Sequence, residues 1–444
     1  MGTAAEGGES ELNACIDAAH DAFFKWRTTP RGERSRLLRK IAATVRDREA
    51  ELVQLLVQEV GKPKTWSKGE VARLALTFDY AADALSNFGL ESIPVDLDPR
   101  GGDYVCSSER VPRGPIFCMV PYNWPFNLTA HKVAPALASG NTVIVKTSPL
   151  APMSTLALVR LIHECGAPNG VVNAWNGADR YVLPALADTR VKMLSFTGSA
   201  RVGWMLKKEV FDRPVALELG GDGFVVLDKS ASLDWAVKRI VAGGFGYAGQ
   251  VCIAVQHVLA HESIYEELRE GLTAAVKNCR TGDPQLESTV CGPLISTSAA
   301  DKVEATVEQA ALAGGSILVH GARAGNVVAP VLLENVPFET SMGCEEVFGP
   351  VVDIAPFSTL DKAIERVNRS KYGIQLGLFT DCRRSVERFY REVETGGLIV
   401  NDYPTLRFDN VPYGGVKQSG FGREGVRYAM EEMTQPKALV YKRS

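Results

Sequence analysis

Residues 115–146, PIFCMVPYNWPFNLTAHKVAPALASGNTVIVK, carry the pattern that decides the fold. Two short apolar runs, Pro115–Val120 and Thr142–Val145, enclose a segment with helical spacing of its apolar residues, Leu128–Ala138. A strand, a helix and a second strand in this order are typical of a parallel βαβ unit. This stretch therefore predicts a doubly wound parallel sheet with a ligand at the carboxyl ends of its strands.

The same alternation continues on both sides of this unit. Helical periodicity over Arg31–Val60 precedes it, and a second alternation of strands and helices starts after the glycine-rich stretch Gly243–Gly249. We expect an α/β fold with two α/β domains. Further predicted strands are Gly170–Ala174, Met193–Phe196, Val215–Leu219 and Val258–Ala260, and further predicted helices are Ser154–Cys165, Val202–Val210, Ser263–Lys277 and Thr297–Ala313.

The composition sets limits on the function. A chain of 444 residues allows roughly three units of about 150 residues each. The net charge of −3 comes without any block of like charge, so neither a nucleic acid nor a membrane surface is expected as a partner. The nine cysteines are scattered without a CxxC pair. They indicate free thiols in a reducing cytoplasm rather than disulfides or a metal site.

Two residues stand out as candidates for chemistry before any family is considered. Cys252 lies three residues after a glycine, in Gly249-Gln250-Val251-Cys252. A tight turn there could present a nucleophile, and the alternative is a buried structural thiol. Glu218 lies in an apolar strand that ends in two glycines. Burial there would raise its pKa toward the range of a general base, unless the side chain reaches solvent at an edge.

A third motif, Thr197-Gly198-Ser199-Ala200-Arg201-Val202-Gly203, reads as a strand-to-helix turn. Its free N–H groups could face a pyrophosphate, and an ordinary helix capped by Ser199 is the alternative.

Seven short motifs follow one another along the chain: Pro121-Tyr122-Asn123-Trp124-Pro125, Val145-Lys146, Phe196-Thr197-Gly198-Ser199, Glu218-Leu219-Gly220-Gly221, Gly249-Gln250-Val251-Cys252, Glu346-Val347-Phe348-Gly349-Pro350 and Pro412-Tyr413-Gly414-Gly415-Val416-Lys417. In this order and spacing they resemble the aldehyde dehydrogenase superfamily, from about Leu12 to the carboxyl end. Several tens of residues that usually precede the first helix of that family are missing. We expect this difference to affect stability or assembly more than mechanism.

The resemblance implies three structural units. A Rossmann-like NAD(P)-binding domain would comprise residues 1–95 and 113–220, and a catalytic domain residues 221–418. Residues 96–112 and 419–444 would form a small β bridging domain that pairs with a neighbouring subunit. A homodimer or homotetramer is therefore expected.

The resemblance also implies the catalytic residues. Cys252 would be the nucleophile that forms a hemithioacetal and then a thioester, with hydride transfer to a nicotinamide. Asn123 and the backbone N–H of Cys252 would stabilise the oxyanion. Glu218 would activate the hydrolytic water, which favours a free carboxylic acid as the product.

For the cofactor, the resemblance places Lys146 at the adenine ribose, Ser199 at the pyrophosphate and Glu346 at the nicotinamide ribose. Pro149 stands where NAD-preferring members often have glutamate, so we expect NADP to be tolerated beside NAD. Arg180 and Lys192 are alternatives for contacting a 2′-phosphate or are simply surface charges. The remaining implied cofactor residues are Ser148, Gly177, Phe196, Thr197, Gly198, Glu218, Leu219, Gly220 and Phe348.

The implied aldehyde tunnel is polar at three positions, Asn127, His131 and Arg407. A guanidinium suits a carboxylate, phosphate or phosphonate, so a small polar or anionic aldehyde is expected, such as a semialdehyde or a lactaldehyde-like compound. The alternative for Arg407 is an ion pair with Asp409 or Asp402. The other predicted tunnel residues are Trp124, Val251, Ile253 and Tyr413.

Two other functions are considered. A thiol hydrolase or acyltransferase would use Cys252 without a nicotinamide, but none of the six histidines lies in an obvious catalytic signature. A retired enzyme that serves as a binding protein is disfavoured by the presence of Cys252, Glu218 and Asn123 together. His257, where close relatives often carry arginine, is a smaller departure from the family pattern.

Overall fold

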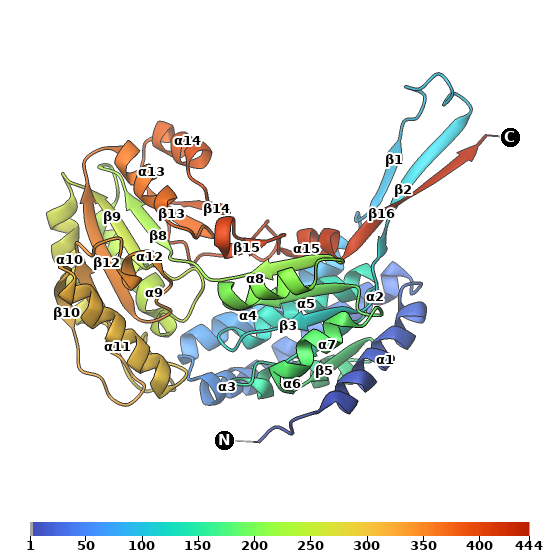
Figure 1. Cartoon of the computed structure of the whole chain (residues 1–444), viewed down its shortest axis with the longest axis horizontal. Helices are drawn as coiled ribbons and strands as arrows, with labels where there is room; N and C mark the ends of the chain where they lie inside the picture. The colour runs from blue at the N-terminus through green and yellow to red at the C-terminus, as the bar shows by residue number, and fades with distance from the viewer. Residues whose placement is uncertain (1–2, 444) are drawn as a thin grey trace.

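Three β-sheets organise the computed structural model, which describes residues 3–443. Two of them lie in separate α/β lobes, and the third forms an arm that projects from one lobe (Figure 1). The predicted α/β class is confirmed. None of the helices within these residues is both long and apolar enough to cross a membrane.

The first lobe contains a six-stranded sheet in the order β15-β7-β6-β3-β4-β5. Neighbouring strands are parallel except for the antiparallel pair β15–β7. The strands are β3 (Ile116–Met119), β4 (Val143–Lys146), β5 (Val172–Trp175), β6 (Met193–Thr197), β7 (Val215–Glu218) and β15 (Gly420–Phe421).

Side-chain alternation gives this sheet two buried faces. Ile116 and Cys118 point into one core and Phe117 into another, so both faces need a layer of helices. One face is covered by α2 (Arg31–Asp47), α3 (Glu49–Val60), α4 (Lys64–Ala84), α5 (Pro125–Ser139), α6 (Pro152–Glu164) and α15 (Val426–Glu432), and the other by α1 (Glu9–Trp26), α7 (Val182–Ala187) and α8 (Ala200–Glu209).

The second lobe contains a seven-stranded sheet in the order β10-β11-β12-β9-β8-β13-β14, parallel except for β10–β11. Its strands are β8 (Phe224–Leu227), β9 (His257–His261), β10 (Ser316–His320), β11 (Val331–Glu334), β12 (Val351–Phe357), β13 (Gln375–Phe379) and β14 (Gly397–Val400). The longer helices of this lobe are α9 (Leu233–Phe245), α10 (Tyr265–Lys277), α11 (Thr297–Leu312), α13 (Leu360–Arg369) and α14 (Arg383–Glu392), with the short α12 (Ser341–Cys344).

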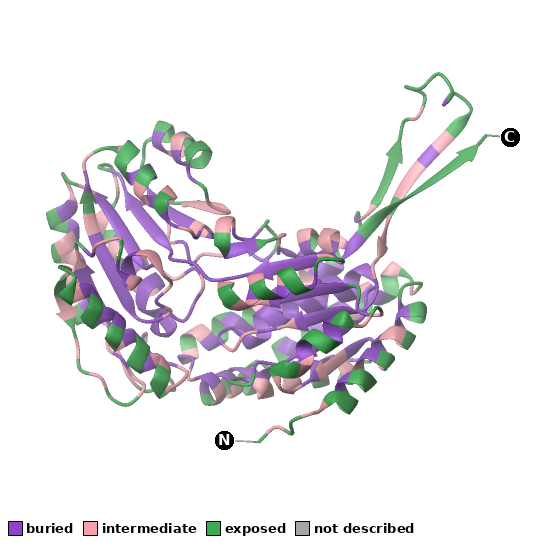
Figure 2. Cartoon of the chain, viewed as in Figure 1, coloured by how far each residue is buried: buried purple, intermediate pink, exposed green. Residues whose placement is uncertain are grey.

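The arm is an antiparallel sheet of β1 (Leu90–Ile93), β2 (Tyr104–Pro112) and β16 (Thr434–Lys442). Its strands β1 and β16 are largely exposed, whereas the central strands of both large sheets are buried (Figure 2). The expected pairing of the two strand-like segments outside the domains is present, because β16 pairs with β2 over its whole length.

The boundary between the arm and the first lobe differs from the expected one at two places. β1 belongs to the arm although it precedes residue 96, because it pairs with β2. β15 and α15 belong to the first lobe although they follow residue 418, because β15 pairs with β7 and Val426 and Met430 are buried in the lobe's core.

Candidate active site

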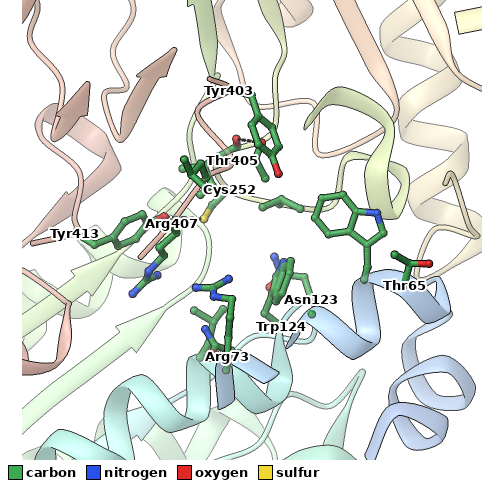
Figure 3. Close-up of a pocket in the computed structure, with 16 residues that line it drawn as sticks. Thr65, Arg73, Asn123, Trp124, Cys252, Tyr403, Thr405, Arg407 and Tyr413 are labelled. Atoms are coloured by element: carbon green, nitrogen blue, oxygen red, sulfur yellow. Dashed lines mark hydrogen bonds between the residues drawn. The ribbon is translucent and has the colours of Figure 1, made fainter. Parts of the chain in front are cut away.

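Cys252 lies in the loop that follows a short 3-10 turn, Gly246–Gly249. Tyr247 and Ala248 both adopt left-handed backbone angles, with φ of 53° and 54°. Such angles strain residues with a Cβ, and the wholly buried side chain of Tyr247 holds the turn in place. The loop thus presents Cys252 to a cavity of about 240 Å³ (Figure 3).

The Cys252 thiol is protonated at rest. Burial raises its pKa to about 11, although a hydrogen-bond contact with the Tyr413 hydroxyl, Sγ to Oη 3.3 Å, opposes the shift. No histidine among residues 3–443 contacts the thiol by a hydrogen bond. Activation of this thiol therefore requires a base other than histidine.

Asn123 faces the same cavity from the segment that leads into α5 (Figure 3). Its Nδ2 donates a hydrogen bond of 2.9 Å to the carbonyl of Gln250, two residues before Cys252. A side-chain amide carries two N–H groups, so one remains for another acceptor. The structure thus brings Asn123 and Cys252 together as the sequence suggested.

Glu218 is the last residue of β7 and is buried. Burial, reinforced by the negative charge of Glu424, raises its pKa well above the ordinary value. Its Oε2 has no hydrogen-bond partner. Gly414 lets this carboxyl approach, because a Cβ there would stand 3.0 Å from Oε1. Glu218 is therefore a buried carboxyl with a raised pKa and an unpartnered Oε2, and it does not line the cavity of Cys252 directly.

A cluster of charged side chains lies beside Cys252 and Glu218. Lys132 Nζ lies 3.2 Å from Glu424 Oε1, and Arg407 Nη2 lies 3.0 Å from Glu424 Oε2. Arg73 reaches from α4 to Asp409, with Nε to Oδ2 at 3.0 Å. Three cations, Lys132, Arg407 and Arg73, thus meet two carboxylates, Glu424 and Asp409, so these five groups carry a net positive charge beside the cavity.

Arg407 forms the expected ion pair with Asp409 and has a second, closer partner in Glu424. Its guanidinium pairs with Glu424 and stands 3.6 Å from Asp409, whereas Asp402 pairs with Arg239. Arg407 still lines the cavity, stacked 3.6 Å from the centroid of the Tyr413 ring. Its ion pairs and its place in the cavity wall therefore coexist.

His131 was predicted to line the tunnel, but it does not line the cavity. Its side chain is wholly buried and its Nε2 lies 2.8 Å from Asp409 Oδ1. Burial and the nearby Arg407 lower its pKa, so it is a neutral partner of Asp409 rather than part of the cavity wall. The other predicted tunnel residues do line the cavity: Trp124, Asn127, Val251, Ile253, Arg407 and Tyr413.

One side of the cavity belongs to α4, which the sequence analysis did not assign. Trp66, Gly69 and Arg73 all line the cavity, and their spacing of three and four residues places them on one face of the helix. A large aromatic residue, a glycine and an arginine at this spacing form a sequence pattern from which this part of the cavity wall could have been predicted. Other lining residues that were missed are Thr65, Leu128, Tyr403, Thr405 and Leu406.

The residues expected at the cofactor's ribose and pyrophosphate gather at the carboxyl ends of β4, β6 and β7. Lys146 ends β4, and its Nζ lies 2.8 Å from Asp179 Oδ1. Thr197 ends β6 and has a buried hydroxyl without a partner. Ser199 begins α8, and its side chain makes no capping bond there. These free polar groups at strand ends are suited to a dinucleotide.

The opposite wall of the expected cofactor site comes from the second lobe. Glu346 accepts a hydrogen bond from the Gly221 N–H at 3.1 Å, and burial raises its pKa to about 7. Gly220 makes this approach feasible, since a Cβ there would stand 2.2 Å from Glu346 Oε2. The Phe348 ring packs edge-on against Tyr122, with centroids 6.2 Å apart.

The other expected cofactor residues line the same region. Pro149 and Gly177 border a hollow together with Asp179, Ser148 is buried at its edge, and Leu219 packs against Gly203 of α8. Phe196 fills the space beside Gly198, where a Cβ would stand 2.6 Å from its ring. Asp179, which the sequence analysis did not consider, is the carboxylate nearest to Lys146.

A Rossmann-type sheet faces a second α/β lobe that presents a half-buried thiol to a cavity, an arrangement typical of nucleotide-dependent oxidoreductases. The model of the aldehyde dehydrogenase family matches residues 1–439, and the chain belongs to this family.

Relatives of known activity resemble the chain over nearly its whole length. The 3-sulfolactaldehyde dehydrogenase of Priestia aryabhattai is 37% identical over 433 residues, which are 97% of this chain and 90% of that protein. The lactaldehyde dehydrogenase of Methanocaldococcus jannaschii is 36% identical and covers 97% of this chain and 92% of its own length.

The solved structures agree with this assignment. The aldehyde dehydrogenase 21 of Physcomitrella patens, in complex with its reaction product succinate, matches with a TM-score of 0.96 and 37% identity over 99% of this chain and 92% of that one. The glyceraldehyde-3-phosphate dehydrogenase GapN of Methanocaldococcus jannaschii, complexed with NADP, matches with a TM-score of 0.95 and 35% identity over 100% and 96%.

Proposed function

We propose that this enzyme oxidises a small polar or anionic aldehyde to its carboxylic acid, with NAD or NADP as the hydride acceptor. The observation that carries the substrate class is the excess positive charge beside the Cys252 cavity. Arg73 and Arg407 both line that cavity, and they share their carboxylates, because both approach Asp409 and the second partner of Arg407, Glu424, also pairs with Lys132.

The reaction begins at the Cys252 thiol. Its proton passes through water to the ionised carboxylate of Glu218, which lies outside the cavity wall, and the thiolate adds to the aldehyde carbon to form a hemithioacetal. When bound, a nicotinamide would accept the hydride that leaves this adduct as the thioester forms. The second Nδ2 hydrogen of Asn123 and the backbone N–H of Cys252 hold the oxygen that gains negative charge.

Hydrolysis completes the cycle. Glu218, once ionised, takes a proton from a water molecule, and the resulting hydroxide attacks the thioester carbon. The carbon–sulfur bond breaks, and the acid leaves as the thiolate regains its proton. One water is consumed for each aldehyde oxidised, and two protons are released in all.

The residues at the strand ends fit the dinucleotide. Lys146 and Asp179 would meet the adenine ribose, Thr197 and Ser199 the pyrophosphate, and Glu346 the nicotinamide ribose. The buried, unpartnered hydroxyl of Thr197 supports this assignment, and the side chain of Ser199, which makes no capping bond, is exposed beside it at the carboxyl end of β6.

The comparisons support the substrate class. One relative is a 3-sulfolactaldehyde dehydrogenase and one structure holds succinate as product, so each acts on an aldehyde with an anionic group. We infer that the arginines of this chain serve an anionic group in the same way.

Reduced nicotinamide, followed by its absorbance, tests the proposal. Succinic semialdehyde and pentanal are offered with each cofactor to the native enzyme and to Cys252→Ala. We expect turnover with the native enzyme, a clear preference for the anionic aldehyde, and none with Cys252→Ala. The absence of cofactor reduction with both aldehydes and both cofactors would contradict the proposal, and cleavage of a thioester by the same protein would then support a thiol hydrolase.

We also propose that the arm pairs with a second copy of the chain. Its strands leave exposed edges and apolar side chains, among them Leu97, Leu439 and Val440, which are 89%, 60% and 55% exposed. Such edges favour strand pairing between subunits. Sedimentation should show a dimer or tetramer, and a monomer alone at micromolar concentration would contradict the pairing.

A further inference from the structure

An ion pair that the mechanism does not use lies wholly inside the molecule. Lys62 stands between α3 and α4, and Glu70 lies in the second turn of α4. Their side chains are fully buried and hydrogen-bonded to each other. Burying two charges is costly unless both are satisfied further, so the other contacts of this pair show what it holds in place.

Glu70 holds the start of α5. Its Oε1 accepts hydrogen bonds from the backbone N–H of Phe126, at 2.9 Å, and of Asn127, at 3.1 Å. Both groups belong to the first turn of α5, where N–H groups lack helical partners and a carboxylate is favoured by the helix dipole. Asn123 lies immediately before this turn, so the carboxylate of Glu70 fixes the segment that carries the amide.

Lys62 contacts both walls of the site. Its Nζ lies 3.9 Å from the ring centroid of Trp124, the residue after Asn123. The same Nζ lies 4.7 Å from the ring centroid of Tyr247, in the strained turn that leads to Cys252. Cation–π contacts of a desolvated ammonium are stronger than exposed ones. A single charge therefore joins the segment of the amide to the segment of the thiol.

We propose that Lys62 and Glu70 are positioning residues that set the place of the Asn123 amide relative to Cys252. This inference rests on the proposed role of Asn123 as an oxyanion donor. Neither Lys62 nor Glu70 touches the substrate, because the pair lies behind Trp124 and neither residue lines the cavity.

The test is a double-mutant cycle between Glu70 and Asn123, measured with a neutral aldehyde such as pentanal. Asn123→Ala should lower kcat about 10²- to 10³-fold, the usual loss of one oxyanion donor. Glu70→Ala should lower kcat about 10- to 100-fold, with KM within about threefold. In the Asn123→Ala background, Glu70→Ala should lower kcat by less than about threefold, because the amide to be positioned is gone.

The conservative variants refine the cycle. Glu70→Gln keeps an oxygen for the two N–H groups of α5 and should lose less kcat than Glu70→Ala. Lys62→Met removes the charge but keeps the length of the side chain, and it serves as the second probe where Glu70→Ala does not fold. Lys68→Met on the same helix breaks an exposed pair with Glu287 and should leave kcat unchanged.

The outcomes separate the two proposals. If Asn123→Ala keeps full kcat, the oxyanion role fails and this inference falls with it. If Asn123→Ala is impaired but the effects of Glu70 or Lys62 variants multiply with it, or leave kcat untouched, the oxyanion role stands and the positioning role is overturned.

Discussion

Arg73→Leu is the sharpest test of the substrate class. Arg73 projects from α4 into the cavity, and its side chain is 26% exposed. Two of its nitrogens hold Asp409, at 3.0 and 2.5 Å, and the other N–H groups are left for a ligand. Leucine keeps an apolar stem of similar girth and removes only the charged end.

The expected loss follows from this geometry. A hydrogen bond to a charged group contributes about 1.5–3 kcal/mol. Partial exposure places Arg73 at the lower end, about 1.5–2 kcal/mol, because solvent screens the charge. Since 1.4 kcal/mol corresponds to a factor of ten, kcat/KM for an anionic aldehyde should fall about 10- to 30-fold. For a neutral aldehyde it should change by less than about threefold.

The assay compares succinic semialdehyde with pentanal, which have chains of similar length but differ in the terminal charge. Arg39→Leu is the matched control, because Arg39 also pairs with aspartates of α4 but lies at the surface. Equal losses on the two aldehydes with Arg73→Leu would refute the anion-binding argument. So would a loss of the same size with Arg39→Leu.

Three further predictions concern neighbouring residues. Arg407→Leu should lower the free energy of unfolding by about 3–5 kcal/mol in urea titrations, because it leaves Glu424 short of a buried partner; a neutral effect on stability would show that the pair is dispensable. Glu218→Gln should give a burst of reduced cofactor and then slow turnover, since the thioester is no longer hydrolysed readily. Burial raises the pKa of Glu218 in the folded state, so the free energy of unfolding of the native enzyme falls as the pH rises above 4.5, the ordinary pKa of glutamate. Glu218→Gln does not ionise, so its free energy of unfolding relative to the native enzyme should increase as the pH rises. A relative gain that shrinks with rising pH would contradict this. The native preference for NAD over NADP should stay below about a hundredfold, and Asp179→Ser should shift it toward NADP by a few-fold in binding titrations, because it removes a carboxylate beside Lys146.

The strands of the first lobe could be predicted because they are short, apolar and separated by helical segments. The run Pro115–Val120 became β3, Ile116–Met119, with an error of one residue at each end. Helix α4 was missed for a physical reason. Its buried face contains Ser67, Glu70 and Thr77 among the apolar residues, so the hydrophobic periodicity is interrupted where polar groups have partners in the fold.

Partners distant in sequence limited the prediction of the site. Asn123, Glu218 and Cys252 could be chosen from local motifs. His131 could not be placed, because its partner Asp409 lies 278 residues away. The arm's first strand, β1, was expected in the cofactor-binding domain for another reason, since only its pairing with the next strand, β2, shows that it belongs to the arm.

The antiparallel pair β7–β15 has a consequence for how the molecule folds. Glu218 pairs with Gly420, so the sheet of the first lobe is closed by a strand that arrives only after the whole second lobe. Closing a loop of this size costs roughly 5 kcal/mol of chain entropy by the logarithmic estimate. Pairings so distant in sequence form late and slowly. The first lobe therefore reaches its final core only after the chain of the second lobe has been synthesised, and a fragment that ends at β7 would expose an open edge prone to aggregation.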